Sequence, residues 1–180
     1  MDETGYRYAE RALWDSVGTQ PVERRIDLAR LGTTVSVLET GDGPPVLFVH
    51  GVNNGASSWA SLAAALPDFR CVLVDRPGCG LSDRLPQRLD DLDALAAYAD
   101  LLVPDVLDAL GLDAAPVVAT SLGGYFALRA AATSPTRIST LVLHSWSAGA
   151  SAPPRALRIA SSRRSVASWP RDRRASGRSG

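Results

Sequence analysis

A serine between small residues is the part of this sequence best suited to chemistry. From Val117 to Leu128, a short apolar run precedes Ser121, two glycines follow it, and alanine-rich residues with helical spacing come next. This pattern predicts a strand, a sharp turn and a helix. A serine hydroxyl is a weak nucleophile unless a base and oxyanion donors lie beside it. The turn would expose the Ser121 hydroxyl and place the N–H of Leu122 near it, at the positive end of the helix dipole.

The small residues around Ser121 have a steric reason. Ala119 and Gly123 lie two positions before and after it, where larger side chains would stop the turn from closing. The same pattern also fits an ordinary helix N-cap, in which a serine side chain only accepts a hydrogen bond from the helix. At this point Ser121 is therefore either a candidate nucleophile or a helix cap.

Strands and helices are expected to alternate along most of the chain. Continuous apolar runs predict buried strands at 46–49, 71–75, 116–119 and 138–143, and helical spacing predicts helices at 6–16, 57–66, 91–110 and 122–133. A hairpin that turns at Gly32 is expected between residues 26 and 38. We expect Ser57 or Ser58 to cap its helix and Pro104 to kink or split the helix that contains it.

This alternation predicts an α/β fold with a mostly parallel sheet and helices on both faces. In such sheets the chemistry lies at the carboxyl ends of the strands. His50-Gly51, Asp75 and Ser121 all fall at those ends. The sequence therefore predicts one site shared by three strands.

Three motifs occur in a fixed order, each at the end of a predicted buried strand. They are His50-Gly51-Val52, the segment 75–83 (DRPGCGLSD), and Ala119-Thr120-Ser121-Leu122-Gly123. Together they resemble the N-terminal part of the α/β-hydrolase superfamily, in its serine esterase, C–C hydrolase and haloperoxidase-like branch. The resemblance covers about residues 24–145. It implies an α/β-hydrolase fold that is truncated after about the sixth strand.

The resemblance also implies roles for particular residues. Ser121 matches the position of the family's nucleophile. The backbone N–H groups of Val52 and Leu122 match those of its oxyanion donors. His50 and Gly51 would shape the loop that presents Val52, so that His50 supports the site and is not its base.

Three further residues match supporting positions of the family. Asp75 and Arg76 would fix neighbouring loops by hydrogen bonds, and Gly123 would let the turn close. The sequence departs from the family at Ala119, which replaces a commoner glycine, and at Thr120, which occupies a position that is often histidine.

The catalytic acid and base cannot be assigned from the resemblance. The family places an acid and then a histidine after the serine, whereas here the residues after Ser121 hold only His144 and then Asp172. His144 ends the last predicted strand and has no nearby acid to orient it. We therefore expect a serine hydrolase for an ester or related acyl or C–C bond of a small molecule, inactive or weak as given. The alternative is a non-catalytic fragment or ligand-binding pseudoenzyme.

Residues 151–180 differ from the predicted domain at 1–150. From residue 155 onward they hold eight arginines and one acid, Asp172, without helical or strand periodicity. Three interpretations remain open: a basic tail for nucleic acid or membranes, a disordered terminus, or an out-of-frame read of a GC-rich gene. We favour the last and expect no nucleic-acid or membrane partner.

Composition limits the remaining classes. The chain of 180 residues is 46% hydrophobic, with no apolar run long enough for a membrane span and no signal peptide, so we expect a cytoplasmic protein. Cys71 and Cys79 are expected to be free, and neither a metal nor a cofactor is needed. The apolar strand 138–143 would be an unpaired edge, which predicts possible self-association.

Overall fold

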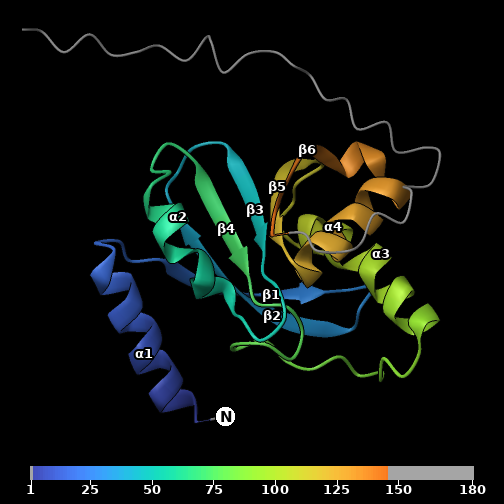
Figure 1. Cartoon of the computed structure of the whole chain (residues 1–180), viewed down its shortest axis with the longest axis horizontal. Coiled ribbons are helices and arrows are strands. Elements are labelled where there is room, and N and C mark those ends of the chain that lie inside the picture. The colour runs from blue at the N-terminus through green and yellow to red at the C-terminus, as the bar shows by residue number, and fades with distance from the viewer. Residues whose placement is uncertain (1, 146–180) are drawn as a thin grey trace, which may run out of the picture.

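A single sheet of six strands organises residues 2–145, the part of the chain that the computed structural model describes (Figure 1). Its order is β1-β2-β4-β3-β5-β6. The β1–β2 and β2–β4 pairs are antiparallel, whereas β4–β3, β3–β5 and β5–β6 are parallel. The mostly parallel sheet is therefore confirmed. The strands are β1 (Val22–Leu28), β2 (Thr33–Thr40), β3 (Pro45–Val49), β4 (Arg70–Val74), β5 (Ala115–Thr120) and β6 (Ile138–His144).

The helices lie where apolar spacing predicted them, with shifted ends. They are α1 (Glu3–Ser16), η1 (Ala56–Trp59), α2 (Ala60–Ala64), α3 (Leu92–Ala109), α4 (Leu122–Thr133) and η2 (Pro135–Arg137). The helix expected from residue 6 starts earlier, because Asp2 caps it by accepting a hydrogen bond from Thr4 N.

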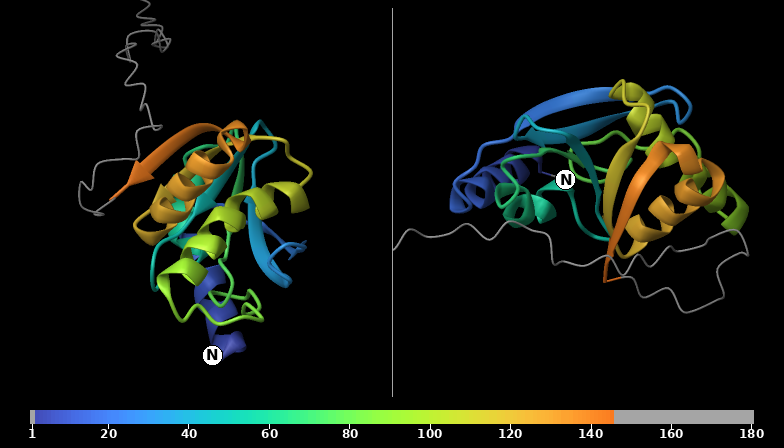
Figure 2. Two further views of the ribbon diagram at one scale, coloured as in Figure 1. Left: turned by 90° about the vertical axis from the view of Figure 1, so that its right-hand side faces the viewer. Right: turned by 90° about the horizontal axis from the view of Figure 1, so that it is seen from above.

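Helices cover both faces of the sheet, and the strands divide their side chains between them (Figure 2). Leu47 and Val49 of β3 pack in one core with residues of α3 and α4. Phe48, one position away on the strand, packs in a second core with Trp14 of α1 and Trp59 of η1. This alternation explains why the strand sequences are continuously apolar, since a strand covered on both faces has no solvent side.

One expectation about helix caps was wrong, and the structure excludes one of the two outcomes expected at Pro104. Neither Ser57 nor Ser58 caps a helix: Gly55 precedes η1, and no side chain caps η1 or α2. Pro104 does not split its helix, since α3 runs unbroken from Leu92 to Ala109. Fully buried residues on either side of the proline, including Leu102 and Val106, hold both halves of α3 against the sheet, and this packing outweighs one missing hydrogen bond.

The hairpin of β1 and β2 turns at Gly32, as predicted, with φ of 62°. The carboxylate of Asp105 in α3 fixes the turn by accepting hydrogen bonds from Arg30 N and Leu31 N. Within residues 2–145 no helix is long and apolar enough to cross a membrane. The segment 151–180 and the predicted domain end at 150 lie outside the described residues.

Candidate active site

Ser121 occupies the sharp turn between β5 and α4, and its backbone is strained there. Its φ of 49° and ψ of −122° lie in a region that side-chain-bearing residues rarely adopt. Ser121 stands at the N-cap position of α4, yet its side chain makes no capping hydrogen bond and is exposed. The interpretation of Ser121 as an ordinary helix cap is therefore wrong, because its side chain accepts no hydrogen bond from the helix.

Two glycines let the end of β3 approach this turn closely. A Cβ atom at Gly123 would overlap with the carbonyl oxygen of Val49 and lie 2.6 Å from that of His50. A Cβ atom at Gly51 would lie 3.0 Å from Cβ of Ser121. The loop after β3 and the turn after β5 are thus in direct contact, as expected for strands whose carboxyl ends share one edge.

The two predicted oxyanion donors belong to the two segments that meet here. Leu122 is the first residue of α4, so its N–H has no partner within the helix. Val52 follows Gly51 in the segment 51–55, which we call the oxyanion loop after the role predicted for Val52, and is 55% exposed. No described residue accepts a hydrogen bond from Val52 N. Both N–H groups are therefore available at the edge where Ser121 lies.

His50 is buried, and both of its ring nitrogens are engaged. Nε2 accepts a hydrogen bond from Arg76 N at 3.1 Å, so Nδ1 carries the proton and donates to Gly51 O at 2.8 Å. Burial, followed by the nearby Arg76 charge, lowers the pKa of His50 to about 4. The ring is thus neutral at pH 7 and has no free nitrogen for a proton.

Arg76, which we expected to fix loops together with Asp75, makes several contacts at the site. Its side chain donates from Nε to His50 O at 3.1 Å and from Nη2 to Gly51 O at 2.8 Å. The guanidinium also lies 5.3 Å from the ring centre of Phe126 in α4. One buried cation therefore joins the start of the oxyanion loop to the helix after Ser121. The sequence signal for Arg76 was its place in the 75–83 motif.

Asp75 is 2% exposed and holds two loops through its carboxylate. Oδ1 accepts from Ala56 N at 2.6 Å, just after the oxyanion loop, and Oδ2 accepts from Leu81 N at 3.1 Å. Burial raises the pKa of Asp75 to about 6, against the opposing effect of these two bonds. The carboxylate therefore ties the oxyanion loop to the turn after β4.

His50 and Asp75 should affect stability in opposite directions as pH changes. The pKa of His50 falls from 6.5 to about 4 on folding, so its stabilisation is lost as pH falls through that range. The pKa of Asp75 rises from 3.8 to about 6, so its contribution is lost as pH rises. Each shift corresponds to about 3 kcal/mol at most.

We expect Asp75→Asn to reveal the loss of stability at low pH that His50 causes, because the opposing contribution of Asp75 is then absent. Between pH 6.5 and 4 its free energy of unfolding should fall more steeply than that of the wild type, by up to about 3 kcal/mol. Urea denaturation at several pH values measures this difference. Parallel pH profiles for the two proteins would contradict the assignment.

His144 lies beside the turn through its backbone. It pairs with Thr120 in the parallel β5–β6 register, and its carbonyl oxygen accepts a hydrogen bond from Ser121 N at 3.3 Å. Its side chain is exposed. The structure thus places the backbone of His144 beside Ser121. Among the described residues, no side-chain hydrogen bond orients the His144 ring.

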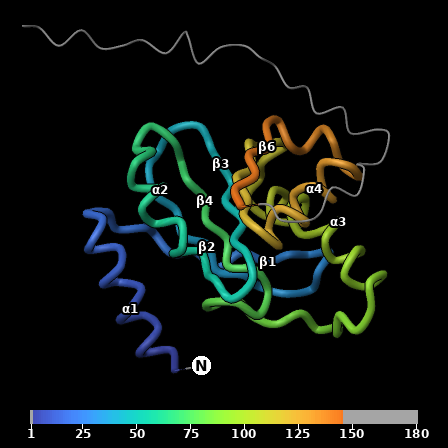
Figure 3. Tube along the Cα trace, in the orientation of Figure 1, coloured from blue at the N-terminus to red at the C-terminus, as the bar shows by residue number. Residues whose placement is uncertain are grey.

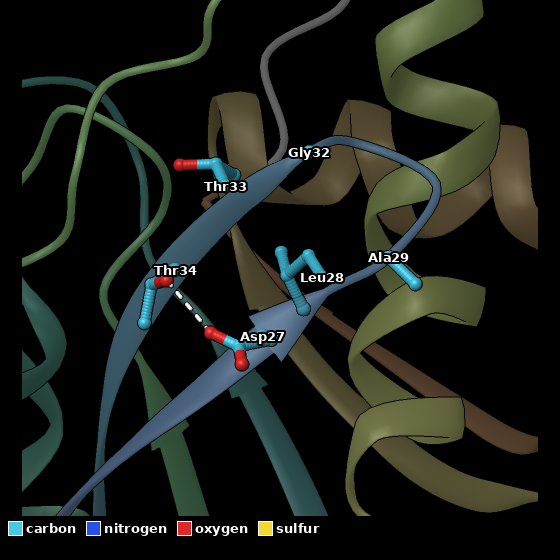
Figure 4. Close-up of a pocket in the computed structure, with 6 residues that line it drawn as sticks. All are labelled: Asp27, Leu28, Ala29, Gly32, Thr33 and Thr34. Carbon is cyan, nitrogen blue, oxygen red and sulfur yellow. Dashed lines mark hydrogen bonds between the residues drawn. The ribbon is translucent and has the colours of Figure 1, made fainter.

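A shallow pocket lies elsewhere, on the β1–β2 hairpin (Figure 4). Its lining includes Asp27, Leu28 and Thr34, and Thr34 Oγ1 donates to Asp27 Oδ1 at 2.7 Å. None of its lining residues belongs to the site around Ser121. Within residues 2–145, no cluster of three histidine, cysteine, aspartate or glutamate side chains could hold a metal ion.

Comparison with known proteins identifies the family to which this fold belongs. A family model described as alpha/beta hydrolase fold matches residues 44–169, which include His50, Asp75 and Ser121. The chain belongs to the α/β-hydrolase family. The match extends into the Arg- and Ser-rich segment beyond the described residues.

Two curated relatives illustrate the similarity of this hydrolase-fold chain. A cis-3-alkyl-4-alkyloxetan-2-one decarboxylase of Shewanella oneidensis is 33% identical over 131 residues, which are 67% of this chain and 38% of the relative. A 2-hydroxymuconate semialdehyde hydrolase of Pseudomonas sp. is 31% identical over 71% of this chain and 44% of its own length. The chain thus spans about two fifths of the curated relatives it matches.

A solved structure supports the fold. The 2-hydroxy-6-oxo-6-phenylhexa-2,4-dienoate hydrolase of a Rhodococcus strain matches with a TM-score of 0.62 and 22% identity, over 69% of this chain and 46% of the other. At this identity the likeness concerns the fold, and the α/β-hydrolase fold expected from the three motifs is confirmed.

Proposed function

We propose that this chain supplies the nucleophile and the oxyanion donors of a serine hydrolase. The observation that carries the proposal is the strained backbone of Ser121, whose exposed hydroxyl makes no capping bond. Strain of this kind persists only where surrounding packing enforces it, and it is common at functional sites. The N–H groups of Val52 and Leu122 would stabilise the oxyanion that forms when Ser121 attacks a carbonyl.

The proposed substrate is a small molecule with an ester or a related acyl or C–C bond. The names of the relatives support this class, since they include a hydrolase of a muconate semialdehyde and a decarboxylase of an oxetan-2-one. An attack by Ser121 on a carbonyl carbon is a step that such substrates permit.

The base of the reaction is not His50 in this proposal. Its two nitrogens are already bonded and its pKa is lowered to about 4. His144 is the other histidine, and between Ser121 and Ser145 the sequence has no aspartate or glutamate to orient it. This second observation favours the alternative function, a non-catalytic fragment or ligand-binding pseudoenzyme. Weak turnover is expected if the chain is an enzyme.

Trapping an acyl group on the protein tests the proposal. A serine that attacks without an oriented base for the second step should release its acyl group slowly. After incubation with p-nitrophenyl acetate and acid quenching, mass spectrometry should locate an acetyl group on the peptide that contains Ser121. Asp75→Asn keeps Ser121 but alters the carboxylate that binds Ala56 N and Leu81 N. It therefore shows whether these loop contacts affect acylation of Ser121. Acetyl groups absent from Ser121, or no more frequent there than on other hydroxyls, would contradict the proposal.

We also propose that the chain self-associates through β6. Val142 is 50% exposed, and β6 pairs with β5 on one side and with no other strand of the described residues. An apolar strand with a free edge pairs readily with another chain. Light scattering during size-exclusion chromatography should show oligomers, and a clean monomer would contradict this proposal.

A further inference from the structure

We infer that helix α1 is a positioning element for the oxyanion loop, an inference that rests on the proposed function of that loop. The family model begins at residue 44, so α1 lies outside the match. In the structure α1 lies against η1, the short helix that follows the oxyanion loop (Figure 3). The contacts between them are specific and buried.

The first contact is a chain of hydrogen bonds centred on Ser57 of η1. Its hydroxyl accepts from Trp14 Nε1 at 3.1 Å and donates to Glu10 Oε1 at 2.5 Å. Trp14 is 1% exposed and belongs to the core that includes Phe48 and Trp59. A donor and an acceptor from two successive turns of α1 therefore fix one side chain of η1.

The second contact is made by Tyr6 at the end of the oxyanion loop. A Cβ atom at Gly55 would lie 3.0 Å from the Tyr6 hydroxyl oxygen and 3.0 Å from Asp75 Oδ1. The Gly55 backbone is thus held between a side chain of α1 and the carboxylate that binds Ala56 N. Burial, and then the charge of Asp75, raises the pKa of Tyr6, so that its hydroxyl stays protonated.

Both ends of the loop are consequently fixed. Arg76 Nη2 binds Gly51 O at the start, and the contacts of Asp75, Tyr6 and Ser57 hold the end. Only residues 52–54 lie between, and Asn53 adopts a φ of 56°. A shift of α1 would move η1 and change the direction of the Val52 N–H. An oxyanion donor displaced by about 1 Å loses much of its effect on the rate.

Ser57→Ala tests this inference, with Ser16→Ala as the matched control. Ser16 is a serine of α1 itself, but it is exposed, and its hydroxyl donates only to the local carbonyl of Leu13. We expect Ser57→Ala to lower kcat for p-nitrophenyl acetate about tenfold to a hundredfold with little change in KM. Ser57→Thr, which keeps the hydroxyl, should restore most of the lost rate.

Amide hydrogen exchange gives a readout that does not depend on activity. In Ser57→Ala the hydrogen-bonded amides of Ala56 and Ser58 should exchange at least about tenfold faster, while those of β3 and β4 keep wild-type rates. Equal exchange and equal kcat in Ser57→Ala and Ser16→Ala would overturn the inference. A general loss of protection throughout the sheet would also overturn it, because α1 would then act on global stability. If the wild-type chain has no turnover that depends on Ser121, the proposed function fails and hydrogen exchange alone decides the role of α1.

Discussion

Gly123→Ala is expected to destabilise the fold by about 3 kcal/mol or more, although alanine is the better helix former. Gly123 is the second residue of α4, where intrinsic propensity would favour alanine by about 1 kcal/mol. The added methyl would overlap with Val49 O and approach His50 O to 2.6 Å. These atoms belong to the backbone of a central strand and its end, so they cannot move without disturbing β3.

Urea denaturation of Gly123→Ala and Gly111→Ala compares their free energies of unfolding. The comparison separates the clash of the added methyl with the backbone of β3 from the cost of replacing a glycine. Gly111 has a φ of 68°, and a Cβ atom there would meet nothing within 4 Å. That control should cost about 1 kcal/mol, from backbone strain alone. Equal free energies of unfolding for the two variants would show that β3 and the turn at Ser121 are not in the close contact described here.

The sequence predicted the sheet well because its strands are buried on both faces. Runs such as residues 46–49 are continuously apolar, and this pattern follows directly from the two cores on either side of β3. The turn at Gly32 and the helix at 122–133 were predicted for equally local reasons. The bounds of β3, β4, β5 and β6 differed by at most one residue, whereas β1 begins at Val22, four residues before the expected start of the hairpin. Local patterns do not fix where pairing begins and ends.

Long-range contacts could not be predicted in the same way. Trp14 and Ser57 are 43 positions apart, and nothing in either segment indicates that their side chains form a hydrogen bond. Ser57 instead looked like a helix cap, which is the local role of a serine before an apolar helix. Pro104 likewise predicted a kink or a split, and the split does not occur because tertiary packing holds α3 together.

The candidate site was partly predictable. The expectation that His50-Gly51, Asp75 and Ser121 lie at one edge follows from parallel strands, and Gly51 does meet Ser121. The lowered pKa of His50 and the contacts of Arg76 depend on burial that the sequence does not show. The roles of Ser121, Val52 and Leu122 stay predictions.

Two variants of Ser121 should separate chemistry from strain. Ser121→Ala removes the hydroxyl and keeps the strained backbone, whereas Ser121→Gly removes both. We expect the turnover of both variants to be at least about tenfold lower than that of the wild type, because neither can form an acyl intermediate. Ser121→Gly should be about 1–2 kcal/mol more stable than Ser121→Ala, because glycine adopts a positive φ without strain. Thermal or urea unfolding measures that difference.

The rate of p-nitrophenol release from p-nitrophenyl acetate, compared between the wild type and Ser121→Ala purified in parallel, tests the central claim most directly. The wild type should release p-nitrophenol slowly but measurably above buffer, and Ser121→Ala should fall to the buffer rate. His144→Ala in the same series shows whether that histidine acts as a base. Equal rates for the wild type and Ser121→Ala would contradict the claim that Ser121 is a nucleophile.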